Sequence, residues 1–316
     1  MGLGLLNILT GGVKNFNPRT DIPSLKGKTI LVTGGNNGLG KESILQLAYH
    51  EPSLIWLAAR GEARAQAAID DIRKEVPNAS IRPLNLDLAD FDSVKAAARR
   101  VLSESDRLDI LMLNAGIMAT PAGLTKSGYE IQFGTNHVGH ALLTKLLLPL
   151  LTKTAATSNS DVRVIVLSSE AHRFKPRGGI IFDSLKTTAE NFHTATRYGQ
   201  SKTANILFAT EMARRYPQIR TVAVHPGAVD TNLATPFTQS SILWRPFAMI
   251  YFRVMALSVQ DGAKNQLWAS VAADAKSGGY YNPIGYVKAA DADATNEETA
   301  KKLWEWTEKE LEGQEV

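Results

Sequence analysis

Tyr198 and Lys202 stand four residues apart, a spacing that places both side chains on one face of a helix. A phenol with an ordinary pKa of about 10 is a poor acid–base catalyst at neutral pH unless a nearby cation favours its phenolate. Lys202 can supply that cation, and its amine can also hold a hydroxyl of a bound ligand. Of the eight tyrosines, Tyr198 alone has a lysine four residues later. One such pair is close to what chance gives, so the hypothesis of proton transfer needs support from other positions.

The run Thr-Gly-Gly-Asn-Asn-Gly-Leu-Gly at residues 33–40 is a second candidate site. The apolar residues 29–32 before it predict a buried strand, and residues 41–49 after it predict a helix. Glycines at such a junction let the backbone approach a ligand closely, and the first free amides of the helix point at that ligand. Amides and the positive end of the helix dipole suit a dinucleotide pyrophosphate. An ordinary glycine-rich turn has the same pattern, so the run alone leaves both interpretations open.

Strand and helix patterns alternate along the chain, beginning at this junction. Besides residues 29–32, continuous apolar runs predict strands over 54–59, 81–86, 110–113, 164–167 and 221–224. Helical patterns occur over 41–49, 62–75, 90–102, 129–151 and 203–216. Continuous apolar strands are typical of a sheet covered on both faces. We therefore predict an α/β, doubly wound Rossmann fold, with a mostly parallel sheet of about seven strands and helices on both faces.

Composition narrows the classes of protein that need be considered. The 316 residues are 44% hydrophobic and 21% charged, as in soluble globular proteins. No Pro- or Ser-rich linker divides them, so we expect an N-terminal extension over 1–24 and one domain over 25–316. The net charge of +4 comes from scattered basic residues, which disfavours nucleic acid as a partner. The absence of cysteine excludes disulfides, thiolate catalysis and thiolate metal sites.

The residues after the second and third predicted strands bear on the choice of dinucleotide. A dinucleotide-binding fold often places a carboxylate after its second strand, where it binds the ribose hydroxyl of NAD. This chain has Arg60 there, and a guanidinium can bind the 2′-phosphate of NADP. Arg64 is an alternative contact, and a merely solvated loop is the other explanation of Arg60. Asp87 could accept a hydrogen bond from the adenine amino group, although a helix-capping residue would look the same.

Further polar groups follow the remaining strands in a fixed order. They are Asn114-Ala115-Gly116, Asn136 in the next helix, Ser168-Ser169, and His225-Pro226-Gly227 with Thr231 shortly after. With the glycine run and the Tyr198–Lys202 pair, this ordered set resembles the single-domain short-chain dehydrogenase/reductase family. The resemblance covers Lys28 to about Pro283. Residues 133–140 and 167–172 are most similar to the retinol-dehydrogenase-type branch, which includes many fungal and plant reductases.

The resemblance implies a catalytic site of four residues. Tyr198 matches the tyrosine that exchanges a proton with the carbonyl or alcohol oxygen. Lys202 matches the lysine that lowers the tyrosine pKa and binds the nicotinamide ribose. Ser169 matches the serine that hydrogen-bonds the reacting oxygen, with Ser168 as the alternative. Asn136 matches the asparagine that supports a lysine-bound water in the proton relay.

The resemblance also implies a site for NADP(H), which Arg60 favours over NAD. We expect that site to comprise Gly34, Asn36, Asn37, Gly38, Leu39, Gly40, Arg60, Asp87, Leu88, Asn114, Ala115, Gly116, Tyr198, Lys202, Pro226, Gly227, Val229 and Thr231. No metal is expected, because His137 and His140 have a spacing that can bind metal but no evident third ligand. The resemblance explains both histidines as packing residues. More residues separate Ser169 from Tyr198 than in the family's simplest members, so residues 170–197 are predicted to be an inserted loop near the pocket.

Two apolar segments bear on membrane contact. Residues 1–9 are too short to cross a bilayer and lack the charged start of a signal peptide. Residues 237–257 are interrupted by Arg245, Pro246 and Arg253. We interpret residues 232–258 as a lid over the substrate, with a membrane-surface helix as the alternative. The sequence thus predicts a cytoplasmic protein and leaves peripheral membrane contact open.

These observations lead to one predicted function and one alternative. The prediction is an NADP(H)-dependent oxidoreductase that interconverts a carbonyl and an alcohol on a lipophilic or aromatic small molecule. A polyketide-like, retinoid-like or steroid-like compound would qualify. The alternative is a catalytically silent NADP-binding scaffold or regulatory protein. The resemblance also leaves open a homodimer through the helices that carry Asn136 and Tyr198.

Overall fold

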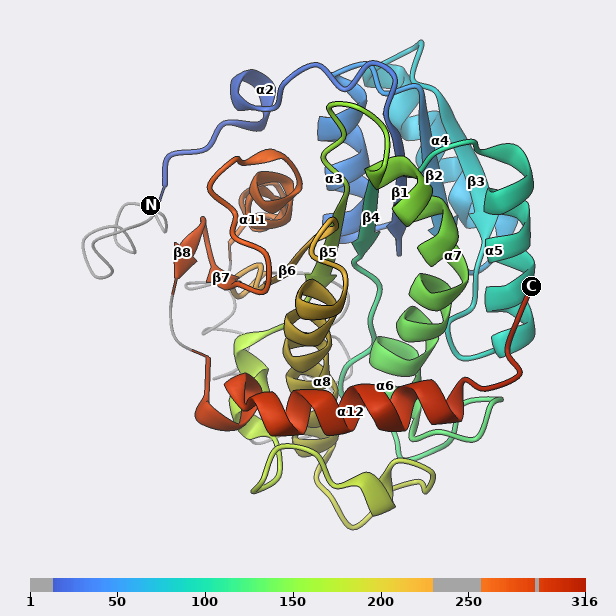
Figure 1. Ribbon diagram of the computed structural model, residues 1–316. Helices are drawn as coiled ribbons and strands as arrows, with labels where there is room; N and C mark the ends of the chain where they lie inside the picture. The colour runs from blue at the N-terminus through green and yellow to red at the C-terminus, as the bar shows by residue number, and fades with distance from the viewer. Residues whose placement is uncertain (1–13, 230–256, 288–289) are drawn as a thin grey trace, which may run out of the picture.

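The computed structural model describes residues 14–229, 257–287 and 290–316, which build one sheet between two layers of helices (Figure 1). The strands are β1 (Thr29–Thr33), β2 (Leu54–Ala59), β3 (Ile81–Asn85), β4 (Ile110–Leu113), β5 (Arg163–Leu167), β6 (Arg220–Val224), β7 (Tyr280–Asn282) and β8 (Tyr286–Val287). Their order is β3-β2-β1-β4-β5-β6-β7-β8; β8 alone is antiparallel to its neighbour. The predicted doubly wound, mostly parallel sheet is confirmed. The eighth strand has only two residues, too few to leave a periodic signal in the sequence.

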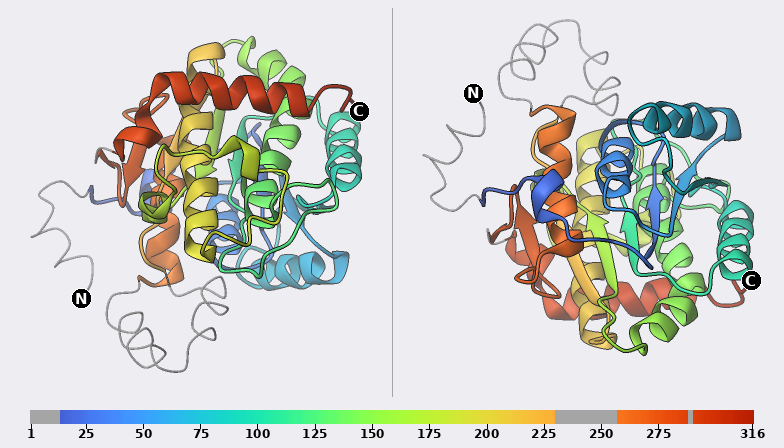
Figure 2. Two further views of the ribbon diagram at one scale, coloured as in Figure 1. Left: turned by 90° about the horizontal axis from the view of Figure 1, so that it is seen from below. Right: turned by 90° about the horizontal axis from the view of Figure 1, so that it is seen from above.

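The helices divide between the two faces of the sheet. They are α2 (Pro18–Asp21), α3 (Gly38–Ala48), α4 (Glu62–Glu75), α5 (Phe91–Glu104), α6 (Ile131–Phe133), α7 (Gly139–Ala155), α8 (Thr194–Arg215), α11 (Val259–Val271) and α12 (Glu297–Glu310). One core joins α3, α4 and α11 to the sheet, and the other joins α5, α7, α8 and α12. Successive strand residues supply opposite cores, as Leu31 and Val32 do. Helix α12 crosses α8 and packs against it (Figures 1 and 2), so it covers part of one helix considered for a homodimer.

The helix expected over residues 129–151 is interrupted. It consists of α6, a π-helical turn at Gly134–Val138 and then α7. The turn is fully buried and contains Asn136. A single π turn does not disturb the apolar periodicity of the flanking helices enough to be predicted, and such turns are frequent at functional sites.

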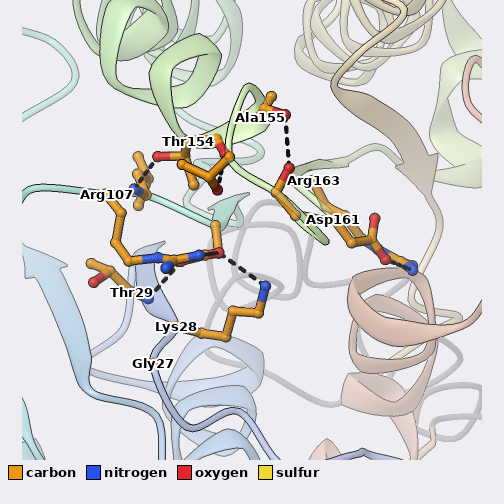
Figure 3. A network of polar contacts seen from close by, with 12 residues as sticks. Gly27, Lys28, Thr29, Arg107, Thr154, Ala155, Asp161 and Arg163 are labelled. Atoms are coloured by element: carbon orange, nitrogen blue, oxygen red, sulfur yellow. Dashed lines mark hydrogen bonds and ion pairs between the residues drawn. The ribbon is translucent and has the colours of Figure 1, made fainter.

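The amino edge of the sheet is held by a polar network around Asp109, which is fully buried before β4 (Figure 3). Its carboxylate accepts from the Thr29 amide at 2.9 Å and from Lys28 Nζ at 3.1 Å, and Arg107 donates to both its oxygens. Burial by itself would raise the pKa of Asp109, but these donors hold it below its usual value. The Asp109 carboxylate is thus satisfied within the protein, whereas ligands of such sheets bind at the opposite, carboxyl edge.

Segments outside the alternating pattern pack onto the domain. Of the predicted N-terminal extension, residues 14–24 are described, and Phe16 and Ile22 are buried in the core beside α3 and α11. The predicted inserted loop contains 3₁₀ turns at Glu170–Phe174 and Phe182–Ser184. Lys175 in this loop pairs with Asp291 at 2.8 Å, which ties the loop to the C-terminal segment.

The structure bears on membrane contact only in part. Within the described residues, no helix combines the length and apolarity needed to cross a bilayer. The segment interpreted as a lid lies outside the described residues except for its last two positions, 257 and 258.

Candidate functional site

A cleft of about 440 Å³ opens at the carboxyl edge of the sheet, where the strand order reverses between β1 and β4. Such a switch point is the usual ligand site of doubly wound sheets. Predicted site residues that line it are Gly34, Asn36, Asn37, Gly38, Leu39, Arg60, Asp87, Leu88, Asn114, Ala115, Gly116, Tyr198, Lys202 and Pro226. Residues more than a hundred positions apart in sequence therefore line one cavity.

Five of the remaining predicted residues do not line the cleft: Gly40, Asn136, Ser169, Gly227 and Val229. Three of these lie behind it. Gly227 and Val229 pack toward Leu257 and Gly262, and Gly40 supports the glycine run from within α3. Thr231 lies outside the described residues.

The glycine run forms a tight cradle at the start of α3. A Cβ on Gly40 would lie 2.3 Å from the carbonyl oxygen of Gly34, so only glycine lets the first turn of the helix fold against the loop. The Asn37 side chain accepts from the Gly38 amide at 2.8 Å and marks the helix start. The first two residues of this eleven-residue helix, Gly38 and Leu39, line the cleft, where a phosphate site is expected.

Asn114 connects the carboxyl ends of β1 and β4. Its Nδ2 donates to the Thr33 carbonyl at 2.8 Å, while the Ala115 amide donates to Thr33 Oγ1 at 2.9 Å. Its Oδ1 accepts from Gln266 of α11 at 3.3 Å. Both polar atoms of the Asn114 side chain thus bond to other protein groups. The side chain therefore acts on the cleft by holding the backbone around it in place.

Two arginines form the outer end of the cleft. Arg60 and Arg64 are both exposed, both line the cavity, and neither has an ion pair with another described residue. Asp87 lines the same region, and its Oδ1 accepts from the Ala89 amide at 3.0 Å. The N-cap of α5 is Asp90, so the helix-capping explanation of Asp87 is wrong. The arginines are suited to an anion such as a phosphate monoester.

Tyr198 and Lys202 meet at the inner end of the cleft. Both are buried on α8, and Lys202 Nζ lies 5.6 Å from the centre of the Tyr198 ring. Burial raises the pKa of Tyr198 to about 12, against a lowering by its hydrogen bond with Ser169. This direction is opposite to the expected lowering by Lys202, because the phenol loses more hydration than its polar neighbours replace. Burial also lowers the pKa of Lys202 to about 8.

The two adjacent serines have different surroundings. Ser168 is buried, and its hydroxyl donates to the Lys202 carbonyl at 2.8 Å, which holds β5 against α8. Ser169 begins the 3₁₀ turn, where its Oγ accepts from the Ala171 amide at 3.1 Å, and it is near enough to Tyr198 to lower the pKa of the phenol. Of the pair, Ser169 therefore has its hydroxyl beside the phenol.

Asn136 lies one layer behind Tyr198 and Lys202. Its side chain exchanges hydrogen bonds of 2.8 and 3.0 Å with the backbone of Ile117, and its carbonyl accepts from His140 Nδ1 at 3.0 Å. Since a carbonyl only accepts, Nδ1 carries the proton, and Nε2 accepts from Thr33 Oγ1 at 2.9 Å. Burial lowers the pKa of His140 to about 4, which keeps the imidazole neutral. His140 therefore links the π turn to β1 in addition to packing.

Sequence reasoning missed a further part of the cleft lining, namely Thr33, Ala58, Ala59, Leu86, Ile117, Met118, Thr120, Thr135 and Leu167. Most are apolar residues at strand ends or in the segment after β4, where no chemical signal distinguishes them. Thr135 is an exception, because its buried hydroxyl has no hydrogen-bond partner and lies in the π turn. Its position directly before Asn136 is the only sequence signal that could have identified it.

Comparison with known proteins gives matches over most of the chain. A family model described as short chain dehydrogenase matches residues 28–241, which include every residue assigned above to the cleft. A short-chain dehydrogenase/reductase of Armillaria gallica is 40% identical over 295 residues, 91% of each chain. Retinol dehydrogenase 13 of Homo sapiens is 37% identical, over 89% of this chain and 83% of that protein. The crystal structure of NADPH bound carbonyl reductase from chicken fatty liver has 26% identity and a TM-score of 0.63, covering 84% of this chain and 100% of that one.

Proposed function

Because the chain belongs to the short-chain dehydrogenase/reductase family, in its retinol-dehydrogenase-like branch, we propose that it is an NADPH-dependent reductase of lipophilic ketones or aldehydes. The observation that carries the proposal is that Tyr198 and Lys202 meet at the inner end of the cleft, with Ser169 next to the phenol from outside the lining. These three side chains supply a proton donor, a hydrogen bond to a reacting oxygen and a cation.

The residues present fit a bound NADP(H). The amides at the start of α3 would hold its pyrophosphate, Arg60 and Arg64 the 2′-phosphate, and Lys202 the nicotinamide ribose. When bound there, the cofactor supplies the hydride that the carbonyl carbon receives. The preference for NADP over NAD rests on two arginines that form no ion pair with a described residue and on the absence of a carboxylate directly after β2. A relative of this fold, the chicken carbonyl reductase, is described as NADPH bound.

The protonation of Tyr198 suits the reductive direction. With a pKa of about 12 the phenol keeps its proton at neutral pH, which suits a general acid that donates to a carbonyl oxygen. Ser169 would donate a hydrogen bond to the same oxygen and fix its orientation. Lys202, largely protonated below its pKa of about 8, would stabilise the phenolate left after the transfer.

The substrate class is inferred from the wall next to Tyr198. Ile117 and Met118 present apolar side chains to the cleft, and few charged groups line its inner end. A retinoid-like, steroid-like or polyketide-like carbonyl compound suits such a surface. The alternative, a silent NADP-binding scaffold, requires no ordered contact between Ser169 and Tyr198, so this contact favours the enzyme.

The proposal is tested by NADPH oxidation with menadione, benzaldehyde and all-trans-retinal, in the wild type and in Tyr198→Phe. Removing a general acid is expected to lower kcat by about a thousandfold, within the usual range for such groups. The phenyl ring preserves the packing of this buried position, so the Kd for NADPH should stay within about twofold. Undiminished turnover in the variant would refute the mechanism. NADPH binding without turnover of any of the three carbonyl compounds by the wild type would favour the scaffold.

A further inference from the structure

We propose that Arg197, through a buried clamp with Glu130, Gln132 and Thr194, positions the substrate-facing wall of the cleft and thereby decides which carbonyl compounds Tyr198 can protonate. This wall consists of residues 117–120. The inference rests on the proposed function for its kinetic test, whereas the clamp itself is defined by contacts in the structure.

The centre of the clamp is a buried ion pair. Arg197 is 4% exposed and Glu130 is fully buried, and Arg197 Nη1 lies 2.8 Å from Glu130 Oε1. The second nitrogen of the same guanidinium, Nη2, donates to the carbonyl of Thr120 at 3.0 Å. Glu130 in turn accepts from the Phe133 amide at 2.7 Å, just before the π turn. A planar, forked cation is needed to reach both partners from one position.

Gln132 and Thr194 add a second set of bonds to the same wall. Gln132 Oε1 accepts from the Ala119 amide at 3.1 Å, and its Nε2 donates to the Thr194 carbonyl at 3.1 Å. Thr194 Oγ1 donates to the Thr120 carbonyl, also at 3.1 Å. The first turn of α8 and the residues before the π turn therefore hold the wall from two sides.

The backbone of the wall requires such support. Ala119 has a φ of +56°, in the left-handed region that side chains other than glycine rarely adopt. Conformations of this kind persist where the surroundings fix them, and they cluster at ligand sites. The bonds to Ala119 and Thr120 fix this one.

The position of the wall points to substrate selection. Ile117, Met118 and Thr120 line the cleft beside Tyr198, and Arg197 directly precedes Tyr198 on α8. The Arg197 guanidinium thus fixes the position of the wall relative to α8, the helix that carries the proton donor. The glycine run and Arg60 belong to β1, β2 and their loops, and no hydrogen bond of the clamp reaches them. A loosened clamp should therefore alter substrate binding and leave the dinucleotide site unchanged.

Arg197→Lys tests this with the charge retained. A lysine can pair with Glu130 but cannot also reach the Thr120 carbonyl, because it lacks the fork. We expect the KM for menadione to rise about tenfold with kcat within about twofold, and the order of preference among menadione, benzaldehyde and all-trans-retinal to change. The Kd for NADPH should be unchanged. Thr194→Val, which removes the hydroxyl bond to the wall and keeps the charge pair, should act in the same direction with a smaller effect.

The matched control is Asp109→Asn, which weakens a separate buried carboxylate network at the amino edge (Figure 3). It should lower Tm but leave the KM values and the substrate order as in the wild type. The same rise in KM in this control would show that both variants act through stability alone, and would overturn the inference. So would an Arg197→Lys enzyme whose kcat falls equally for all three compounds while KM stays constant.

Hydrogen–deuterium exchange gives a readout that does not depend on turnover. Arg197→Lys should speed exchange of the amides of residues 117–120 and leave those of β1 and β4 unchanged. If the wild type reduces none of the three compounds, the proposed function fails, and the exchange data still test the clamp. Unchanged exchange at residues 117–120 would overturn it.

Discussion

Replacing Arg60 and Arg64 with alanine should change the preference between NADPH and NADH. Both side chains are exposed, line the outer end of the cleft and have no ion pair with a described residue. Their charges are therefore available to a 2′-phosphate, which NADH lacks. No other bond within the described structure is lost when they are removed, so folding should be unaffected.

The expected loss in kcat/KM for NADPH follows from the exposure of the two arginines. Hydrogen bonds to charged groups contribute about 1.5–3 kcal/mol, and exposed, solvent-screened pairs lie at or below the lower end. About 1.4 kcal/mol per arginine corresponds to about a tenfold loss in kcat/KM for NADPH. The double variant should approach a hundredfold loss if the two act independently. The value for NADH should stay within about twofold.

The assay is the ratio of kcat/KM for NADPH to that for NADH, measured with menadione at a saturating concentration. Arg99→Ala is a suitable control, since Arg99 is exposed on α5 and does not line the cleft. An unchanged ratio in the double variant would refute the assignment of the phosphate to these arginines. An equal loss with both dinucleotides would show that they bind a part of the cofactor common to both.

Two further predictions concern the same cleft. The kcat for reduction should be constant at low pH and fall as the pH rises through about 8, because Lys202 then loses its charge while Tyr198, with a pKa of about 12, keeps its proton. A profile of kcat that rises steadily up to about pH 10 would contradict this. Gly40→Ala should weaken NADPH binding at least about tenfold in a fluorescence titration, since its Cβ would lie 2.3 Å from the Gly34 carbonyl oxygen. Gly123→Ala, which meets nothing within 4 Å, should bind NADPH like the wild type, and equal binding by both variants would show that the cradle tolerates a side chain.

Features that depend on local periodicity were predictable. The helix expected over 62–75 and the strands expected over 54–59 and 110–113 have the bounds of α4, β2 and β4. The sequence predicted a helix over residues 129–151 but not the π turn that interrupts it, because that turn depends on packing. Strand β8 forms only by pairing with β7, which no run of two residues can signal.

The choice among similar residues required the tertiary structure. Ser168 and Ser169 are chemically identical neighbours, and their contacts separate them: Ser168 donates to the Lys202 carbonyl, whereas Ser169 accepts from the Ala171 amide. Asp87 has helix capping as an alternative explanation in sequence, and the structure shows instead that Asp90 caps α5. In each case the decision depends on which way a strand or helix end points the side chain.

The sequence by itself determined the family resemblance, the class of fold and the candidate residues for proton transfer. These follow from local order: a glycine run between a strand and a helix, and a tyrosine and a lysine one helical turn apart. Only the tertiary structure decided the burial of Tyr198 and Lys202 and the pairing of Arg197 with Glu130, 67 residues away. Burial and long-range pairing depend on how the helices pack on the sheet, and desolvation there sets the protonation of the groups that the sequence names.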